Sequence, residues 1–227
     1  MKYKIGYDDP SPLFRDVGSG VWNSESATLK AKAQRLFILG NIGNAAVVVG
    51  RHAAAHLSHY FANNGMDYFI DLRGLVNDHP DSKTVFDGEV KEAIKFAESL
   101  PLGEAQITST KASASGILPT DSKDWFYAVG AYQAWVPPAN NKPRLYWMDF
   151  EYCFFDQYNW NGDGSVTLCG KTVSDKDMGL FHKMGIAKEY EMRGSFHVSV
   201  EWPLGTSPTV TVPTNLQLAG IGKAIGL

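Results

Sequence analysis

The sequence has few cysteines and no long apolar run, and both absences narrow the classes of protein that it fits. Cys153 and Cys169 lie 16 positions apart, which forms neither a disulfide framework nor a zinc-ligand pattern. We expect two free thiols in a buried strand region, with one disulfide as the alternative after export. No apolar stretch reaches the roughly 18 residues that a membrane-spanning helix needs. The N-terminus, MKYKIGYDDPSP, lacks the apolar core of a secretory signal.

The chain also lacks any concentration of positive charge. Its net charge is −3 and no basic block occurs, which disfavours nucleic-acid binding through phosphate contacts. Hydrophobic residues make up 44% of the chain and charged residues 20%, a balance that indicates a packed core and excludes global disorder. A length of 227 residues suits one large domain, or one domain with an appendage.

The first hundred residues have a helical pattern. Alanine and leucine at helical spacing predict helices over residues 26–39 and 45–63. A third amphipathic helix is expected over residues 82–100, with Asp81 or Ser82 as its N-cap. The helices therefore come first in the chain.

After Pro101 the pattern is that of strands, with alternation and many β-branched and aromatic residues. A helix is expected within this part over residues 174–188, where Ser174 and Asp177 are placed as in a capping box. Extended segments are predicted at residues 67–72, 106–113, 124–137, 144–160, 165–173 and 194–202. Helices followed by a mostly antiparallel sheet with one embedded helix define an α+β domain.

The stretch DQYNWNGDG, residues 156–164, allows more than one interpretation. Its second half has the spacing of a calcium-binding EF-hand loop, but Gly170 stands where the closing glutamate should be, which excludes that loop. Asn-Gly and Asp-Gly instead predict a tight hairpin turn at residues 161–164. Asp156 and Tyr158 lie on one face of an extended segment, because strand side chains alternate.

Four blocks follow one another along the chain: HLSHYFANNG at 56–65, DWFYAVGAYQAWV at 124–136, DQYNWN at 156–161 and LFHKMGIAKEYEMRG at 180–194. In this order and spacing they resemble the catalytic domain of the colicin M family. The resemblance implies a curved, half-open barrel-like sheet. It also implies an antibacterial toxin that hydrolyses lipid II, the polyprenyl-pyrophosphate-linked peptidoglycan precursor, between the lipid and the pyrophosphate. A divalent cation, usually Mg²⁺, is the implied cofactor.

The chain departs from the family's motif, which is Asp-x-Tyr-Asp followed five residues later by His-Arg. Asp156 and Tyr158 match the first two positions, Asn159 replaces the second aspartate, and Ser165 and Val166 stand at the His-Arg positions. Either the site is rebuilt from other residues, or hydrolysis is lost or redirected. The alternative function is accordingly a non-catalytic effector that binds a lipid precursor or perturbs the membrane.

The candidate site residues follow from this motif and from the chemistry of pyrophosphate cleavage, in which cations neutralise charge on the phosphates. Asp156 is the expected metal ligand or water-binding carboxylate. Tyr158 would position a phosphate oxygen or form part of the wall of the site. Asn159 would coordinate or hydrogen-bond, and His182 is a candidate general acid or base. The expected substrate-binding residues are Lys171, Lys183 and Trp160.

Three histidines raise a different possibility. His52, His56 and His59 have the i, i+4, i+7 spacing of one helix face, which would suit a metal-dependent hydrolase with another substrate. Without a Glu between them they do not form the HExxH pattern, so helical histidines in other roles are the simpler interpretation.

The chain is divided here into a lead-in with the first helix at residues 1–45, a catalytic domain at 46–205 and an apolar, glycine-rich tail at 206–227. The tail is either a frayed or docked terminus or a weakly membrane-seeking segment. The expected partners are lipid II or a related polyprenyl phosphate, a membrane surface, secretion machinery and an immunity protein in the producer. We expect synthesis in the cytoplasm without a secretory signal, export as an effector, and action in the periplasm of target bacteria.

Overall fold

The computed structural model describes residues 2–6, 13–101, 103–116, 122–129, 131–135, 146–203, 206, 208 and 210. The helices are α1 (Leu29–Gly40), α2 (Ile42–Val49), α3 (Arg51–Ala62), α4 (Leu72–Asp78), α5 (Pro80–Glu98), α6 (Lys123–Ala128) and α7 (Asp175–Lys183). The strands are β1 (Tyr3–Ile5), β2 (Tyr68–Phe69), β3 (Ile107–Ser109), β4 (Ser113–Gly116), β5 (Ala131–Trp135), β6 (Tyr146–Tyr158), β7 (Ser165–Leu168), β8 (Lys171–Ser174) and β9 (Tyr190–Trp202). Helices thus precede most of the strands, and the predicted α+β class is confirmed. The predicted tail falls almost entirely outside the described residues.

The long antiparallel pair β6–β9 is the centre of the main sheet. It pairs without a break from Tyr146 opposite Trp202 to Tyr158 opposite Tyr190. The sheet order is β2-β9-β6-β5-β4, in which β2 alone runs parallel to its neighbour, so the described strands form an open, mostly antiparallel sheet. Alternate residues of β6, such as Phe150 and Phe154, are buried in the core, as the strand period requires.

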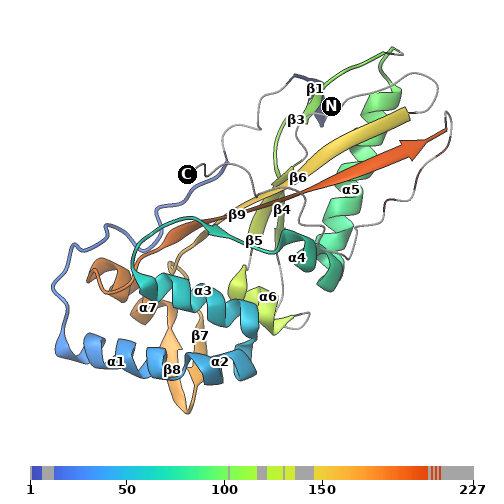
Figure 1. Ribbon diagram of the computed structural model, residues 1–227. Coiled ribbons are helices and arrows are strands. Elements are labelled where there is room, and N and C mark those ends of the chain that lie inside the picture. Colours follow the sequence, from blue (N-terminus) through green and yellow to red (C-terminus); the bar gives the residue numbers. More distant parts are fainter. Residues whose placement is uncertain are drawn as a thin grey trace, which may run out of the picture.

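The two ends of β6 and β9 carry different helices (Figure 1). The helices α1, α2, α3 and α7 gather at one end around the β7–β8 hairpin, whereas α5 lies at the other end beside β1 and β3. Buried residues of α1, including Ala31 and Ile38, belong to the same hydrophobic cluster as the strands. The division at residue 45 remains a prediction.

The predicted helix over residues 45–63 is broken at Gly50 into α2 and α3. Gly50 has φ 108°, a conformation that favours glycine. The Asp124 carboxylate fills the space beside it and accepts hydrogen bonds from the backbone N–H groups of His52 (2.8 Å) and Ala53 (3.0 Å). The first backbone N–H groups of a helix have no partners within it, and these contacts satisfy two of them at the start of α3. They therefore stabilise the break between α2 and α3.

Other local predictions need correction. The strand expected over 124–137 begins as helix α6, because the Ser122 side chain accepts from the backbone N–H of Trp125 and caps a helix. The cap of α5 is His79, followed by a proline at the first turn, and not Asp81 or Ser82.

The turn prediction was also misplaced. Residues 161–164 connect β6 to β7, which do not pair, whereas the tight turn lies between β7 and β8. There Cys169 and Gly170 both have positive φ, 48° and 75°, as a two-residue type I′ turn requires. The capping box of Ser174 and Asp177 is confirmed at the start of α7.

Neither cysteine forms a disulfide, as expected, although Cys169 is exposed at the hairpin turn and Cys153 is half-buried on β6. Among the described residues, none of the helices combines the length and the hydropathy needed to cross a bilayer.

The break at Gly50 generates a stability prediction. Gly50→Ala should lower the free energy of unfolding by about 2 kcal/mol or more, because the added methyl group would overlap the Asp124 side chain at a positive φ. Gly88→Ala, inside α5 with open space around the added carbon, should be neutral or gain about 0.5–1 kcal/mol. Urea unfolding monitored by circular dichroism measures both. Equal stability of the two variants would contradict the assigned role of Gly50.

Candidate functional site

Asp156 lies near the end of β6, opposite Met192 of β9 and on the same face as Phe154 and Tyr158. Burial raises the pKa of its carboxyl group to about 8, and the nearby negative charge of Asp16 raises it further, while a backbone hydrogen bond from Gln157 opposes the shift. At neutral pH this carboxyl group therefore holds its proton. An acid with a pKa near neutrality is suited to proton transfer.

Tyr158 is buried within an aromatic cluster on the same face. Its ring stacks on Tyr190 with centroids 4.9 Å apart and meets the edge of Trp160 at 5.3 Å. Burial raises the pKa of the Tyr158 hydroxyl well above its usual range. The hydroxyl therefore stays protonated and serves as a hydrogen-bonding group, not as a base.

His56 of α3 lies against Tyr158, with ring centroids 5.5 Å apart. The Tyr190 hydroxyl donates to the His56 carbonyl (3.0 Å), so we assign the 2.9 Å contact between His56 Nδ1 and that hydroxyl as donation from the imidazole. Burial lowers the pKa of His56 to about 3, and the neighbouring His52 and His59 add to the effect. A neutral imidazole thus borders the motif tyrosine, although motif reasoning alone did not select it.

The three helical histidines do not form a metal face. His52 Nδ1 bonds the Asp124 carboxylate (2.9 Å), His56 bonds Tyr190, and His59 Nε2 bonds the carbonyl of Met66 (2.7 Å). Each ring has a different partner. Their regular spacing was a real signal, but it marks the packing of α3 on its neighbours and on the motif.

Asn159 lies just past the end of β6 and is held by the N-terminal segment. Its side-chain amide donates to one Asp16 oxygen (2.6 Å), and the Asn161 amide donates to the other (2.7 Å). The backbone N–H of Asp16 in turn donates to Gln157 (2.8 Å). An aspartate at position 159 would face the Asp16 carboxylate, so the amide suits this surrounding better than the acid of the family motif.

His182 is buried and occupied at both ring nitrogens. Its Nδ1 accepts the backbone N–H of Glu189 (3.1 Å), which leaves Nε2 as the donor to the Gly20 carbonyl (3.1 Å). These contacts tie the end of α7 to the start of β9 and to the N-terminal segment. They favour a structural role, and the catalytic role of His182 remains a prediction.

The two lysines predicted to bind substrate lie on different elements. Lys171 begins β8, and its ammonium group lies 4.1 Å from the ring centroid of Phe37 on α1. Lys183 ends α7 and lies beside Gly20. Neither lysine has a described contact with Asp156, and their role in binding substrate remains a prediction.

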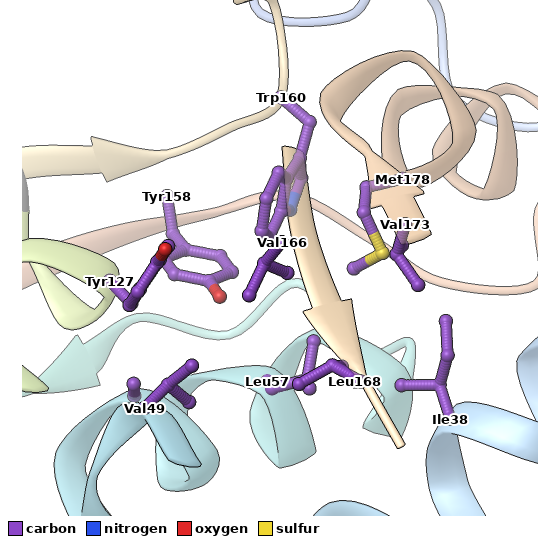
Figure 2. A pocket seen from close by; sticks show the side chains of 11 residues that line it. Ile38, Val49, Leu57, Tyr127, Tyr158, Trp160, Val166, Leu168, Val173 and Met178 are labelled. Carbon is purple, nitrogen blue, oxygen red and sulfur yellow. The ribbon is translucent and has the colours of Figure 1, made fainter. Parts of the chain in front are cut away.

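Trp160 lines an apolar pocket together with Tyr158 (Figure 2). The pocket occupies about 450 Å³, counting its solvent-facing part, between α1, α2 and α3 on one side and the β7–β8 hairpin on the other. The indole Nε1 of Trp160 is buried and finds no hydrogen-bond partner within the described part of the chain. The predicted substrate-binding tryptophan and the motif tyrosine therefore share one cavity.

The described residues contain no group of three or more His, Cys, Asp or Glu side chains able to hold a metal by themselves. Mg²⁺ is commonly held by one or two carboxylates together with substrate phosphates, and Asp156 is the carboxylate of the motif that could serve in this way. The use of magnesium stays a prediction, for an ion that accompanies the pyrophosphate.

Comparison with protein families and with curated proteins gives no match. Among solved structures, the chain is similar to PaeM, a colicin M-like bacteriocin produced by Pseudomonas aeruginosa, with a TM-score of 0.39 and 16% identity over 68% of this chain and 53% of that one. It is also similar to pectocin M2 (TM-score 0.31, 16% identity, 68% and 55% covered) and to truncated syringacin M from Pseudomonas syringae pv. tomato (0.30, 15%, 67% and 60%). The chain thus spans a little over half the length of these proteins.

The raised pKa of Asp156 predicts a specific pH dependence of stability. The folded protein keeps a proton that the unfolded chain releases between about pH 4 and 8, so the stabilisation present at low pH is lost as the pH rises through this window. The loss is at most about 1.4 kcal/mol per pH unit. Asp156→Asn should lack this slope, and urea unfolding between pH 5 and 8 measures it.

Asp163→Asn is the matched control, because Asp163 is an exposed carboxylate on the loop that follows β6. It should keep the slope of the unmodified protein. Parallel stability curves for Asp156→Asn and the unmodified protein would show that Asp156 does not titrate in this window.

Proposed function

We propose that the chain is the catalytic part of an antibacterial toxin that hydrolyses lipid II, or a related polyprenyl pyrophosphate, between the lipid and the pyrophosphate. The observation that carries the proposal is the state of Asp156. The first acid of the motif is a half-buried carboxyl group whose pKa is raised to about 8, on the same strand face as the motif tyrosine. Carboxyl groups with a raised pKa are concentrated at sites of proton transfer, which supports the proposal.

The proposed reaction uses this proton. Water attacks the phosphorus next to the lipid, a new P–O bond forms, and the bond from phosphorus to the polyprenyl oxygen breaks. The leaving oxygen must take up a proton, which the Asp156 carboxyl group donates. The proton of the attacking water restores Asp156 by way of solvent. The Tyr158 hydroxyl, which stays protonated, would donate a hydrogen bond to a phosphate oxygen.

The second candidate is a non-catalytic effector that binds a lipid precursor or perturbs the membrane. It is favoured by Asn159, whose side-chain amide is hydrogen-bonded to Asp16 and cannot act as a general acid or base. In this reading the pocket beside Tyr158 would hold the precursor without cleaving it.

The remaining parts of the proposal concern where the protein acts. We propose that secretion machinery exports it as an effector, that it reaches its lipid at the membrane surface in the periplasm of target bacteria, and that an immunity protein protects the producer. These partners follow from the proposed activity, because lipid II and its relatives are shared by producer and target.

The proposal predicts an Asp156-dependent hydrolysis. Purified protein with Mg²⁺ should release polyprenol from lipid II, and Asp156→Ala should lower the rate by about 100-fold or more, since general acid catalysis contributes about 10²–10⁴-fold. The rate should also fall above about pH 8, where Asp156 loses its proton. Thin-layer chromatography of the released lipid measures both effects, and Asp163→Ala should retain the full rate.

The two candidate functions give different outcomes. If lipid II yields no product, while toxicity in the periplasm of target cells survives Asp156→Ala but is lost when residues 213–227 are removed, the non-catalytic effector is the correct reading. Those residues lie outside the described part of the chain.

A further inference from the structure

The pocket beside the motif has the chemistry of a hydrocarbon-binding site. Its walls come from separate elements: Ile38 of α1, Val49 of α2, Leu57 of α3, and Val166 and Val173 of the hairpin (Figure 2). These are aliphatic side chains without hydrogen-bonding groups. Packed interiors contain few voids larger than a water molecule, and apolar cavities that do exist stay dry and take up apolar ligands. The pocket opens to solvent, so a chain longer than the enclosed space can enter it from one end.

Trp160, which lines the pocket, carries a polar group that the described residues leave unsatisfied. The Trp160 Nε1 group is buried without a described partner, and such a group costs about 1–3 kcal/mol when it is left unsatisfied. The backbone N–H of Trp160 donates to Glu189 (2.9 Å), so the residue is anchored and the indole is held in place. A ligand with an oxygen atom at the end of an apolar chain could accept a hydrogen bond from the indole N–H, while its chain fills the cavity.

The pocket lies beside the strand that carries the motif. Tyr158 lines it, and Asp156 lies two residues earlier on the same face of β6, about 7 Å away along the strand. A chain held in the pocket would therefore lie against the end of this strand.

We propose that this pocket binds the first isoprene units of the polyprenyl chain, with the oxygen end at Trp160. The inference rests on the proposed function for the identity of the chain, but the binding itself requires no hydrolysis. The β7–β8 hairpin closes one wall and pairs with no other described strand. Its alternating faces provide the test, because Val166 points into the pocket and Thr167 is exposed.

The probe is farnesol, which carries an isoprenoid chain and a hydroxyl group but no phosphate. Calorimetric titration of the full chain should detect farnesol binding that inorganic pyrophosphate does not displace. Val166→Phe should weaken binding about tenfold or more by filling the cavity, whereas Thr167→Phe on the other face should change it less than about twofold. Trp160→Phe, which keeps the ring and removes the N–H donor, should weaken binding by about threefold to tenfold.

Several results would overturn the inference. Equal binding by the Val166→Phe and Thr167→Phe variants would place farnesol elsewhere. Tighter binding of dodecanol than of farnesol would assign the pocket to straight chains. Farnesol binding that appears after removal of residues 211–227 and is absent before it would make the chain's own tail the occupant.

The inference and the proposed function can fail separately. If the variants change farnesol binding as expected but lipid II is not hydrolysed, the pocket assignment is correct and the hydrolytic function is wrong. If lipid II is hydrolysed with full dependence on Asp156 but farnesol does not bind, the function stands and the pocket assignment is wrong.

Discussion

The antiparallel pairing of β6 with β9 is the constraint on which the rest of the molecule depends. It runs the full length of both strands and sets which side chains enter the core, because a shift by one residue would turn every side chain to the other face. In this register Asp156 lies half-buried on the core-facing side, opposite Met192, and Tyr158 lies opposite Tyr190. The desolvation that raises the pKa of Asp156 is therefore a consequence of strand register.

The N-terminal segment is the second determinant of the site, and it acts from the opposite face of the sheet. Arg15 lies over the buried ring of Phe155 and forms an ion pair with Glu191 at 2.7 Å. The Asp16 carboxylate accepts hydrogen bonds from the side-chain amides of Asn159 and Asn161. The segment thereby fixes the end of β6. It also explains the amide in the motif, because two carboxylates would otherwise face each other without a cation between them.

Local chemistry decided which parts of the fold were predictable. The capping box at Ser174 is complete within four residues, and it was found from the sequence. The long strands β6 and β9 were also predictable, because the alternation of apolar and polar residues persists over many positions. The break at Gly50 could not be predicted, since it depends on Asp124, which is distant in sequence. The short helix α6 was hidden by its aromatic composition, which resembles that of a strand.

The same distinction applies to the site. The sequence by itself determined that Asp156 and Tyr158 share a face and that the motif's second acid is an amide, because alternation and residue identity are local properties. It also indicated Trp160 as a substrate-binding residue. Only the tertiary structure decided that Asp156 is half-buried with a raised pKa, that His56 packs on Tyr158, and that hairpin and helices line a pocket beside them. The physical reason is that burial, pKa and cavity volume are properties of surroundings, which chain segments distant in sequence supply.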